Sequence, residues 1–286
     1  MSAEVPRYAA VIGGGRMGAG IAQSFATAGT RVTVVEQDRE AAARVRERIA
    51  GSLERAGGRG LLPAAPAEIL ERLSFVGGLA RLPEGVELVV EAVPEIAGLK
   101  AELLAAAEKA VGTDTVLATN TSSLSVTELS AALTRPGRFL GMHFFNPVPA
   151  SSLVELVVAA GTERSAVDRA LAWTAGLGKK DVVVKDSPGF ASSRLGVALC
   201  LEAIRMVEEG VAEPEAIDDA MALGYKHPMG PLRLTDLVGL DVRLAIAEYL
   251  HSTLGERFAP PRLLRDKVAR GELGRSSGQG FYRWES

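Results

Sequence analysis

A run of closely spaced glycines, Gly13-x-Gly15-x-x-Gly18, follows a short apolar segment and precedes a helical pattern. The apolar segment, Tyr8 to Ile12, has the β-branched bias of a buried strand. Apolar residues then recur at helical spacing from Met17 to Ala28. Between a strand and a helix, the first glycine permits a tight turn, the second lets the backbone approach a pyrophosphate, and the third lets the helix pack closely on the sheet. This context predicts a dinucleotide site on the helix N-terminus; the alternative is a glycine-rich turn that binds nothing.

Strand-like and helix-like segments alternate through the first part of the chain. The sequence predicts further strands at Arg31–Val35, Leu88–Val93, Val116–Thr119, Phe139–His143, Leu153–Val158 and Asp181–Val184, and helices at Asp38–Arg55 and Leu99–Val111. Ser125 to Glu128 has the spacing of a capping box, which predicts the start of a short helix. The alternation indicates an α/β fold with a Rossmann-type, doubly wound and mostly parallel sheet.

The pattern changes after a turn signal at Asp186-Ser187-Pro188-Gly189. From there on, helical spacing replaces strand patterns: one amphipathic helix is expected from Phe190 to about Glu209, and another helical segment from Val238 to Leu254. We therefore expect two domains, a Rossmann-type domain at 1–187 and an all-helical domain at 188–286.

Composition excludes several classes of protein. The chain has 32 Lys and Arg against 35 Asp and Glu, so its charge gives no reason to expect nucleic acid as a partner. It has no apolar run of about 18 residues and no basic, apolar leader, so we expect no contact with a membrane and a cytoplasmic location. One cysteine and three scattered histidines do not form a metal-binding pattern.

Glu36 ends the second predicted strand, 18 residues after the last glycine of the motif. A carboxylate there can accept hydrogen bonds from both hydroxyls of an adenosine ribose and would repel a 2′-phosphate, which favours NAD over NADP. The alternative is a solvated charge at a strand end. Arg16 and Arg39 count against this preference for NAD, because a nearby arginine can accommodate the 2′-phosphate of NADP.

His143 and Glu155 lie on consecutive predicted strands among apolar residues. A lone histidine in such a setting is usually a core residue, but a lone carboxylate on an apolar strand is costly unless it is paired. We therefore expect Glu155 to pair with His143 and to fix its tautomer. Asn120 to Leu124 follows another predicted strand at the edge where doubly wound folds bind ligands, so its hydroxyls are candidates for holding a substrate oxygen. The alternative for these hydroxyls is helix capping.

These residues stand in a set of motifs that resembles the 3-hydroxyacyl-CoA dehydrogenase family, close to the short 3-hydroxybutyryl-CoA dehydrogenases. The resemblance extends over nearly the whole chain. It is carried by segments 11–22, 90–95, 120–124, 143–147, 186–190, 227–231 and 278–282.

The resemblance implies an NAD-dependent enzyme that interconverts (3S)-3-hydroxyacyl-CoA and 3-oxoacyl-CoA. His143 would be the general base, Glu155 its orienting carboxylate, and Ser122 a hydrogen-bond donor to the substrate oxygen. Ser52 and Arg59 would lie near the CoA moiety. The residues that would contact the cofactor are Gly13, Gly15, Arg16, Met17, Gly18, Glu36, Glu95, Lys100 and Asn120.

Ser193 departs from the family's pattern, which has asparagine at this position before Arg194. A serine offers one hydroxyl where asparagine offers an amide donor and a carbonyl acceptor, so we expect Ser193 to affect substrate placement. The family also implies a homodimer formed through the helical domain. Two alternatives to the acyl-CoA enzyme are a dehydrogenase of a free hydroxy acid on the same fold and a non-catalytic NAD-binding protein.

Overall fold

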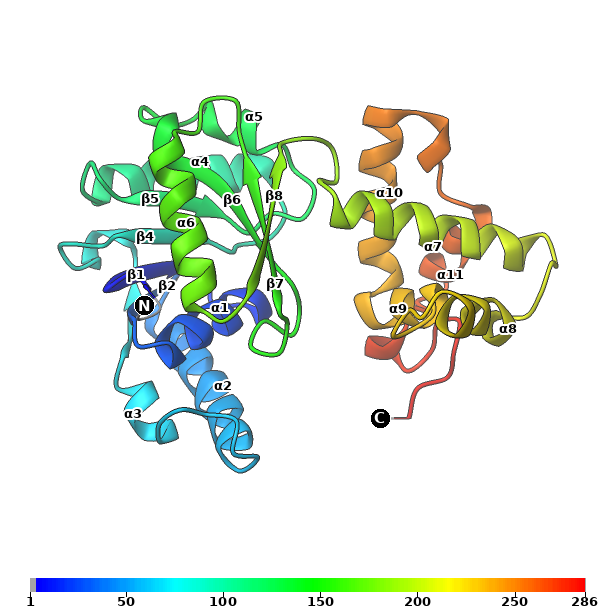
Figure 1. The fold of residues 1–286 in the computed structure, drawn as a ribbon, viewed down its shortest axis with the longest axis horizontal. Helices are drawn as coiled ribbons and strands as arrows, with labels where there is room; N and C mark the ends of the chain where they lie inside the picture. Colours follow the sequence, from blue (N-terminus) through cyan, green and yellow to red (C-terminus); the bar gives the residue numbers. More distant parts are fainter. Residues whose placement is uncertain (1–3, 286) are drawn as a thin grey trace. The chain divides into compact units, whose positions relative to one another are not determined.

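The computed structural model describes residues 4–285. The chain forms two compact units, and the boundary in the sequence lies between Asp186 and Ser187 (Figure 1).

The first unit is built on one sheet of eight strands in the order β3-β2-β1-β4-β5-β6-β7-β8. Neighbouring strands are parallel except for β6 and β7, which are antiparallel. The strands are β1 (Tyr8–Ile12), β2 (Arg31–Glu36), β3 (Leu73–Gly77), β4 (Leu88–Glu91), β5 (Val116–Thr119), β6 (Phe139–Phe144), β7 (Leu153–Val158) and β8 (Lys180–Lys185). This order confirms the doubly wound fold. Its topological switch lies between β1 and β4, and ligands bind at such a switch, beside the carboxyl ends of the strands.

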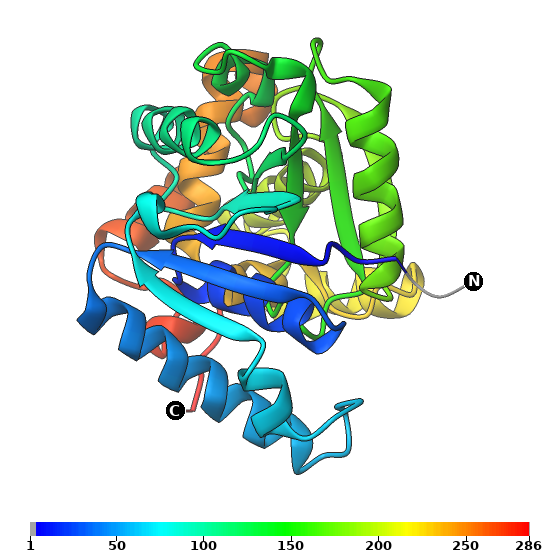
Figure 2. The same ribbon diagram turned by 90° about the vertical axis from the view of Figure 1, so that its left-hand side faces the viewer.

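Helices connect the strands and pack against them. They are α1 (Arg16–Thr27), α2 (Arg39–Gly57), α3 (Pro66–Leu70), α4 (Ala97–Ala110), α5 (Val126–Ser130) and α6 (Arg164–Gly176). Helices α1 and α2 contact β1 to β3, α4 contacts β4 and β5, and α6 contacts β6 to β8; Figure 2 shows α2 alongside β3. The predicted start of a short helix is confirmed: Ser125 is the N-cap of α5, and its hydroxyl accepts a hydrogen bond from the Glu128 amide at 3.1 Å.

The core of this unit follows from the apolar strands. Strands β4 and β5 are buried along their whole length, as expected for parallel strands covered on both faces. Phe25 of α1 and Phe144 of β6 are both buried, and their rings meet edge to face with centroids 6.4 Å apart. Burying side chains of this size stabilises the fold by about 1.5–3 kcal/mol each.

Strand β3 and helices α3 and α6 of this unit are absent from the sequence prediction. Strand β3 lies at the edge of the sheet and pairs only with β2, so just one of its residues, Leu73, is fully buried. A strand that buries so little needs only a weak apolar pattern, and its sequence, LSFVG, gives a weak one.

The second unit is helical. It contains α7 (Ser192–Glu208), α8 (Pro214–Asp219), a π-helical turn η3 (Ala220–Gly224), α9 (Pro231–Val238), α10 (Leu240–Leu254) and α11 (Arg262–Ala269). Over residues 187–285, β-pairing is limited to two isolated bridges near the end of the chain. None of the helices in the described part of the chain is long and apolar enough to cross a membrane.

The helical segment predicted from Val238 to Leu254 is α10, which begins two residues later, at Leu240. Gly239 separates α9 from α10 and has φ +112°, a conformation that side-chain-bearing residues rarely adopt. Val238 is therefore the last residue of α9 and not the first of α10.

Two buried aspartates of the second unit hold the end of the chain. Asp236 accepts hydrogen bonds from the amides of Phe281 and Tyr282, both at 2.9 Å, and from the Trp284 indole at 2.8 Å. Asp218 accepts one from the Tyr282 hydroxyl at 2.8 Å. Burial and the neighbouring Asp218 carboxylate raise the pKa of Tyr282, which keeps this hydroxyl protonated as a donor.

Candidate active site

The glycine motif forms the turn between β1 and α1. Gly13 has φ +88°, and a Cβ at Gly18 would overlap the carbonyl oxygen of Gly13. A Cβ at Gly15 would meet nothing within 4 Å, so the backbone there faces open space that a pyrophosphate can approach. Each glycine therefore has the environment that a dinucleotide site requires.

Glu36, at the end of β2, is held against this turn. Its Oε1 accepts a hydrogen bond from the Gly14 amide at 2.5 Å. The carboxylate is half-buried and is positioned before any ligand arrives, as expected of a residue that binds ribose hydroxyls. Arg16 and Arg39 are both exposed.

His143 and Glu155 face each other across the antiparallel pair of β6 and β7. Nδ1 of His143 lies 3.0 Å from Oε2 of Glu155, and the two residues are 7% and 1% exposed. The predicted pair is thus present. A carboxylate only accepts hydrogen bonds, so Nδ1 carries the proton, and Nε2 is the ring nitrogen that can take up a proton in the neutral imidazole.

The loop after β5 brings Asn120 and Ser122 to the carboxyl ends of the strands. Asn120 Oδ1 accepts a hydrogen bond from the Phe144 amide at 2.8 Å, which ties this loop to the strand that carries His143. Ser122 donates through its amide (2.9 Å) and its hydroxyl (3.3 Å) to Oε1 of Glu95.

Glu95 links this loop to Lys100 on α4. Lys100 Nζ lies 3.3 Å from Oε2 of Glu95 and 2.8 Å from Oε1 of Glu91. Burial acts to raise the pKa of Glu95, but the Lys100 charge and hydrogen bonds from Thr121 and Ser122 outweigh it, so this pKa lies below its usual value. Glu95 therefore remains charged at neutral pH.

Glu91 is a site residue that the sequence reasoning missed. It is fully buried at the end of β4. The available signal was the one that identified Glu155, a single carboxylate within an otherwise apolar strand.

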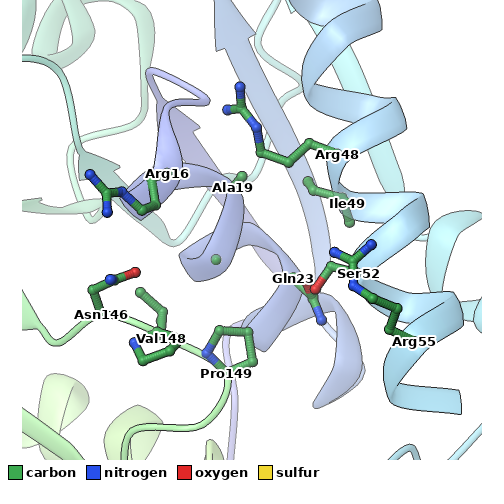
Figure 3. A pocket seen from close by; sticks show the side chains of 12 residues that line it. Arg16, Ala19, Gln23, Arg48, Ile49, Ser52, Arg55, Asn146, Val148 and Pro149 are labelled. Atoms are coloured by element: carbon green, nitrogen blue, oxygen red, sulfur yellow. The ribbon is translucent and has the colours of Figure 1, made fainter. Parts of the chain in front are cut away.

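A shallow cavity of about 180 Å³ lies beside α1 and α2, and Figure 3 shows its lining. Ser52 lines it, together with three arginines, Arg16, Arg48 and Arg55. Arg48 also donates to the carbonyl oxygen of Gly14 at 2.8 Å, next to the glycine turn. Arg59 lies beyond the end of α2, is exposed, and is not among the lining residues.

Ser193 lies in the first turn of α7, in the second unit, and is 9% exposed.

Comparison with known proteins agrees with this arrangement. Residues 8–187 match the family model "3-hydroxyacyl-CoA dehydrogenase, NAD binding domain", and residues 189–284 match "3-hydroxyacyl-CoA dehydrogenase, C-terminal domain". The chain is 44% identical over 276 residues to the "3-hydroxybutyryl-CoA dehydrogenase" of Mycobacterium tuberculosis, covering 95% of this chain and 96% of that protein. It is 40% identical over 287 residues to the mitochondrial hydroxyacyl-coenzyme A dehydrogenase of Rattus norvegicus, covering 98% of this chain and 91% of that protein.

A solved structure extends the likeness to three dimensions. The crystal structure of (S)-3-hydroxybutyryl-CoA dehydrogenase PaaH1 from Ralstonia eutropha matches with a TM-score of 0.92 at 38% identity, covering 98% of this chain and 99% of that one. The chain therefore belongs to the 3-hydroxyacyl-CoA dehydrogenase family and is an NAD-dependent oxidoreductase.

Proposed function

We propose that the protein interconverts (3S)-3-hydroxybutyryl-CoA and acetoacetyl-CoA. The observation that carries this proposal is the buried pair of His143 and Glu155, 3.0 Å apart on neighbouring strands of a dinucleotide-binding sheet. The relatives named as 3-hydroxybutyryl-CoA dehydrogenases support the choice of a short acyl chain.

In the oxidation, Nε2 of His143 takes the proton from the substrate's 3-hydroxyl. Glu155 holds the ring in the tautomer that leaves Nε2 able to accept this proton, and it stabilises the imidazolium that forms. NAD, when bound, supplies the acceptor for the hydride that leaves C3. In the reverse direction His143 returns the proton to the carbonyl oxygen.

The Ser122 hydroxyl, which donates to Glu95 in this structure, turns its proton to the same substrate oxygen and places that oxygen for His143. Asn120 and Glu95 fix the loop that carries Ser122, through the Phe144 amide and through the Ser122 backbone. The glycine turn and Glu36 hold the pyrophosphate and the adenosine ribose of the cofactor, and their geometry fits both groups.

The cavity beside α2 is where we place the phosphates of CoA. Arg16, Arg48 and Arg55 line this cavity together with Ser52, and guanidinium groups bind phosphates through charge-assisted, often bidentate hydrogen bonds. On this view Arg48 and Arg55 belong to the CoA site in place of Arg59.

The test is oxidation of NADH with acetoacetyl-CoA, compared with free acetoacetate. We expect turnover of the thioester and little of the free acid. Preference for the free acid would favour a hydroxy-acid dehydrogenase, and NADH binding without turnover of either would favour a non-catalytic protein. As a matched pair, Arg55→Ala should raise KM for acetoacetyl-CoA several-fold, whereas Arg59→Ala should leave it unchanged.

Cofactor choice gives a second test. Because Glu36 is set to accept ribose hydroxyls, NADH should bind more tightly than NADPH, and Glu36→Ala should narrow that difference. Equal affinity of the unmodified protein for both cofactors would contradict the role of Glu36.

We also propose that the protein is a homodimer formed through its helical unit. Helices α7, α9 and α10 contact one another, and each exposes large apolar side chains. Leu195 is 70% exposed, and Leu234, Val238 and Val242 are 38–43% exposed. Exposed apolar surface of this kind is typical of an interface. Sedimentation should give twice the chain mass, and Leu195→Asp should shift it toward the monomer.

A further inference from the structure

Lys179 is a buried cation between α6 and β8, with only 9% of its surface exposed. Its ammonium group donates to two backbone carbonyl oxygens, those of Val148 at 2.7 Å and Ser151 at 2.5 Å. Among residues 4–285 it makes no ion pair with a carboxylate. Burial lowers the pKa of Lys179, because the charged form loses its contact with water. A buried charge without a counter-charge is costly, so its role should lie in the segment that it holds.

That segment is the turn formed by residues 147–151, between β6 and β7. The Pro147 carbonyl oxygen accepts hydrogen bonds from the amides of Ala150 and Ser151, at 3.0 and 2.9 Å, which closes the turn. Proline has no amide hydrogen, so a turn with two prolines has few donors of its own. Lys179 supplies donors for two of the carbonyl oxygens in this turn.

The same turn forms one wall of the cavity beside α1 and α2. Pro147, Val148 and Pro149 all line this cavity. Figure 3 shows Val148 and Pro149 across the cavity from Ser52 and Arg55 of α2. One wall is therefore apolar and the other carries cations. A CoA molecule whose phosphates bind the arginines has to lie along the apolar wall.

Helix α1 supports this turn at a second point. A Cβ added at Gly20 would lie 2.8 Å from Cβ of Val148 and 3.5 Å from Cδ of Pro149. Such a distance to Val148 is too short for a real contact, so the turn rests directly on the backbone of α1. The turn is thus fixed both by this contact and by the hydrogen bonds from Lys179.

We propose that Lys179 is a positioning residue for the CoA moiety: by holding the carbonyl oxygens of Val148 and Ser151, it keeps the turn in place as the apolar wall of the cavity. The inference rests on the proposed function, which places the phosphates of CoA there. His143 precedes the turn and is held separately, by its pairing with Glu155 across β6 and β7. The effect of Lys179 should therefore be confined to the part of the substrate that occupies the cavity.

The test compares two substrates that share the reacting group. One is acetoacetyl-CoA; the other is the acetoacetyl thioester of N-acetylcysteamine, which lacks the phosphates and the adenosine. Lys179→Met keeps an unbranched side chain and removes both hydrogen bonds. We expect KM for acetoacetyl-CoA to rise at least about fivefold with kcat within about twofold of wild type, the signature of lost binding. The kcat/KM for the truncated thioester should stay within about twofold. A lysine that only stabilises the fold would lower Tm and leave KM of the folded protein unchanged.

A matched control is the next residue in the chain. Lys180 has the same charge and is exposed. Lys180→Met should therefore leave KM and kcat unchanged with both thioesters. An equal rise of KM in the two variants would mean that total positive charge attracts the anionic CoA, and that the turn is not involved.

A second arm does not depend on Lys179→Met folding. Lys179→Gln keeps a neutral donor for the carbonyl oxygens and should raise KM for acetoacetyl-CoA by a smaller factor. Gly20→Ala should also raise this KM, because the new methyl group pushes Val148 away from α1. In the double variant Gly20→Ala/Lys179→Gln, the rise should be less than the product of the two single effects, since a loosened turn can yield to the methyl group.

The outcomes separate the inference from the function beneath it. A wild-type protein that does not turn over acetoacetyl-CoA sinks the proposed function. With an active wild type, any of three results overturns the role of Lys179: a KM for acetoacetyl-CoA that stays normal in the folded Lys179 variants, an equal loss with both thioesters, or independent effects of Gly20→Ala and Lys179→Gln.

Discussion

The buried carboxylates of the two units have different partners. In the first unit, Glu155 faces His143 and Glu91 faces Lys100, so each buried charge meets a group that can carry a positive charge. In the second unit, Asp218 and Asp236 are satisfied by backbone amides and by the neutral side chains of Tyr282 and Trp284.

The difference separates two uses of a buried charge. A carboxylate that is surrounded by neutral donors fixes the positions of those donors, and it acts as a clamp for the chain. A carboxylate beside an imidazole or an ammonium group controls the proton or the position of that group, which is what a reaction centre needs. Both pairs of the first unit also lie toward the carboxyl ends of strands, at the edge where doubly wound folds bind ligands.

The largest effect should come from the imidazole itself. We expect His143→Ala to lower kcat by about 10²- to 10⁴-fold, the usual loss for a general base. NADH binding should be nearly unchanged, because the glycine turn and Glu36 are untouched. Steady-state kinetics together with NADH fluorescence titration measure both, and a variant that keeps normal turnover would remove His143 from the reaction.

Asp236→Ala tests the other kind of buried carboxylate, which is held by neutral donors in the second unit. It leaves the amides of Phe281 and Tyr282 and the Trp284 indole without their acceptor. At about 1–3 kcal/mol for each of the three unsatisfied groups, we expect the free energy of unfolding to fall by at least about 3 kcal/mol in denaturant titrations. Turnover of the remaining folded protein should not change; a large loss of kcat without loss of stability would erase the distinction between the units.

Glu155→Gln keeps the shape of the side chain and removes its charge. An amide can bond to either tautomer of His143, so the ring is no longer held in the active one. We expect kcat to fall by about 10- to 100-fold, as for other carboxylates that orient a histidine, with a smaller effect than His143→Ala. Equal activity of Glu155→Gln and the wild type would mean that the pair is only a core contact.

Glu108 offers a pH test within the first unit. Burial acts to raise its pKa, but hydrogen bonds from Thr134 and Arg135 outweigh this effect and lower it. Its contribution to stability is therefore fully present above the unfolded-state pKa, about 4.3, and is lost as the pH falls through the lower, folded-state value. The difference in unfolding free energy between the wild type and Glu108→Gln should shrink below about pH 4; a difference that is constant with pH would contradict this sign.

The smallest effect is expected at Ser193. Restoring the family's asparagine with Ser193→Asn should change the ratio of kcat/KM for short and long acyl-CoA substrates by a few-fold, because small errors of placement are costly in rate. Ser193→Ala should retain measurable activity. Inactivity comparable to that of His143→Ala would give Ser193 a chemical role, and an unchanged chain-length preference in both variants would make it structural.

The sequence predicts the central strands well because burial on both faces demands continuous apolar runs, as in Val116–Thr119. The sequence pattern misses β3, because a strand at the edge of the sheet buries fewer side chains and needs fewer apolar residues. It also finds the pair of His143 and Glu155, since an isolated carboxylate on an apolar strand requires a partner. The same reasoning applied to Glu91 predicts a buried partner, which the structure identifies as Lys100.

Other site residues leave no such signal. Arg48 and Arg55 are ordinary polar residues of an amphipathic helix, and only the packing of α2 beside the glycine turn brings them to one cavity. Gly239 likewise fits the start of the predicted helix, and only its positive φ shows that α10 begins after it.

The clamp formed by Asp218 and Asp236 also bears on synthesis in the cell. Its donors, Phe281, Tyr282 and Trp284, follow Asp236 by 45 or more residues in the chain. The first unit can fold while translation continues, since domains generally fold as units from the N-terminus. The helical unit cannot complete the hydrogen bonds of its two buried aspartates until Trp284 has been translated. A chain cut before Phe281 would therefore leave the Asp236 carboxylate without three of its donors.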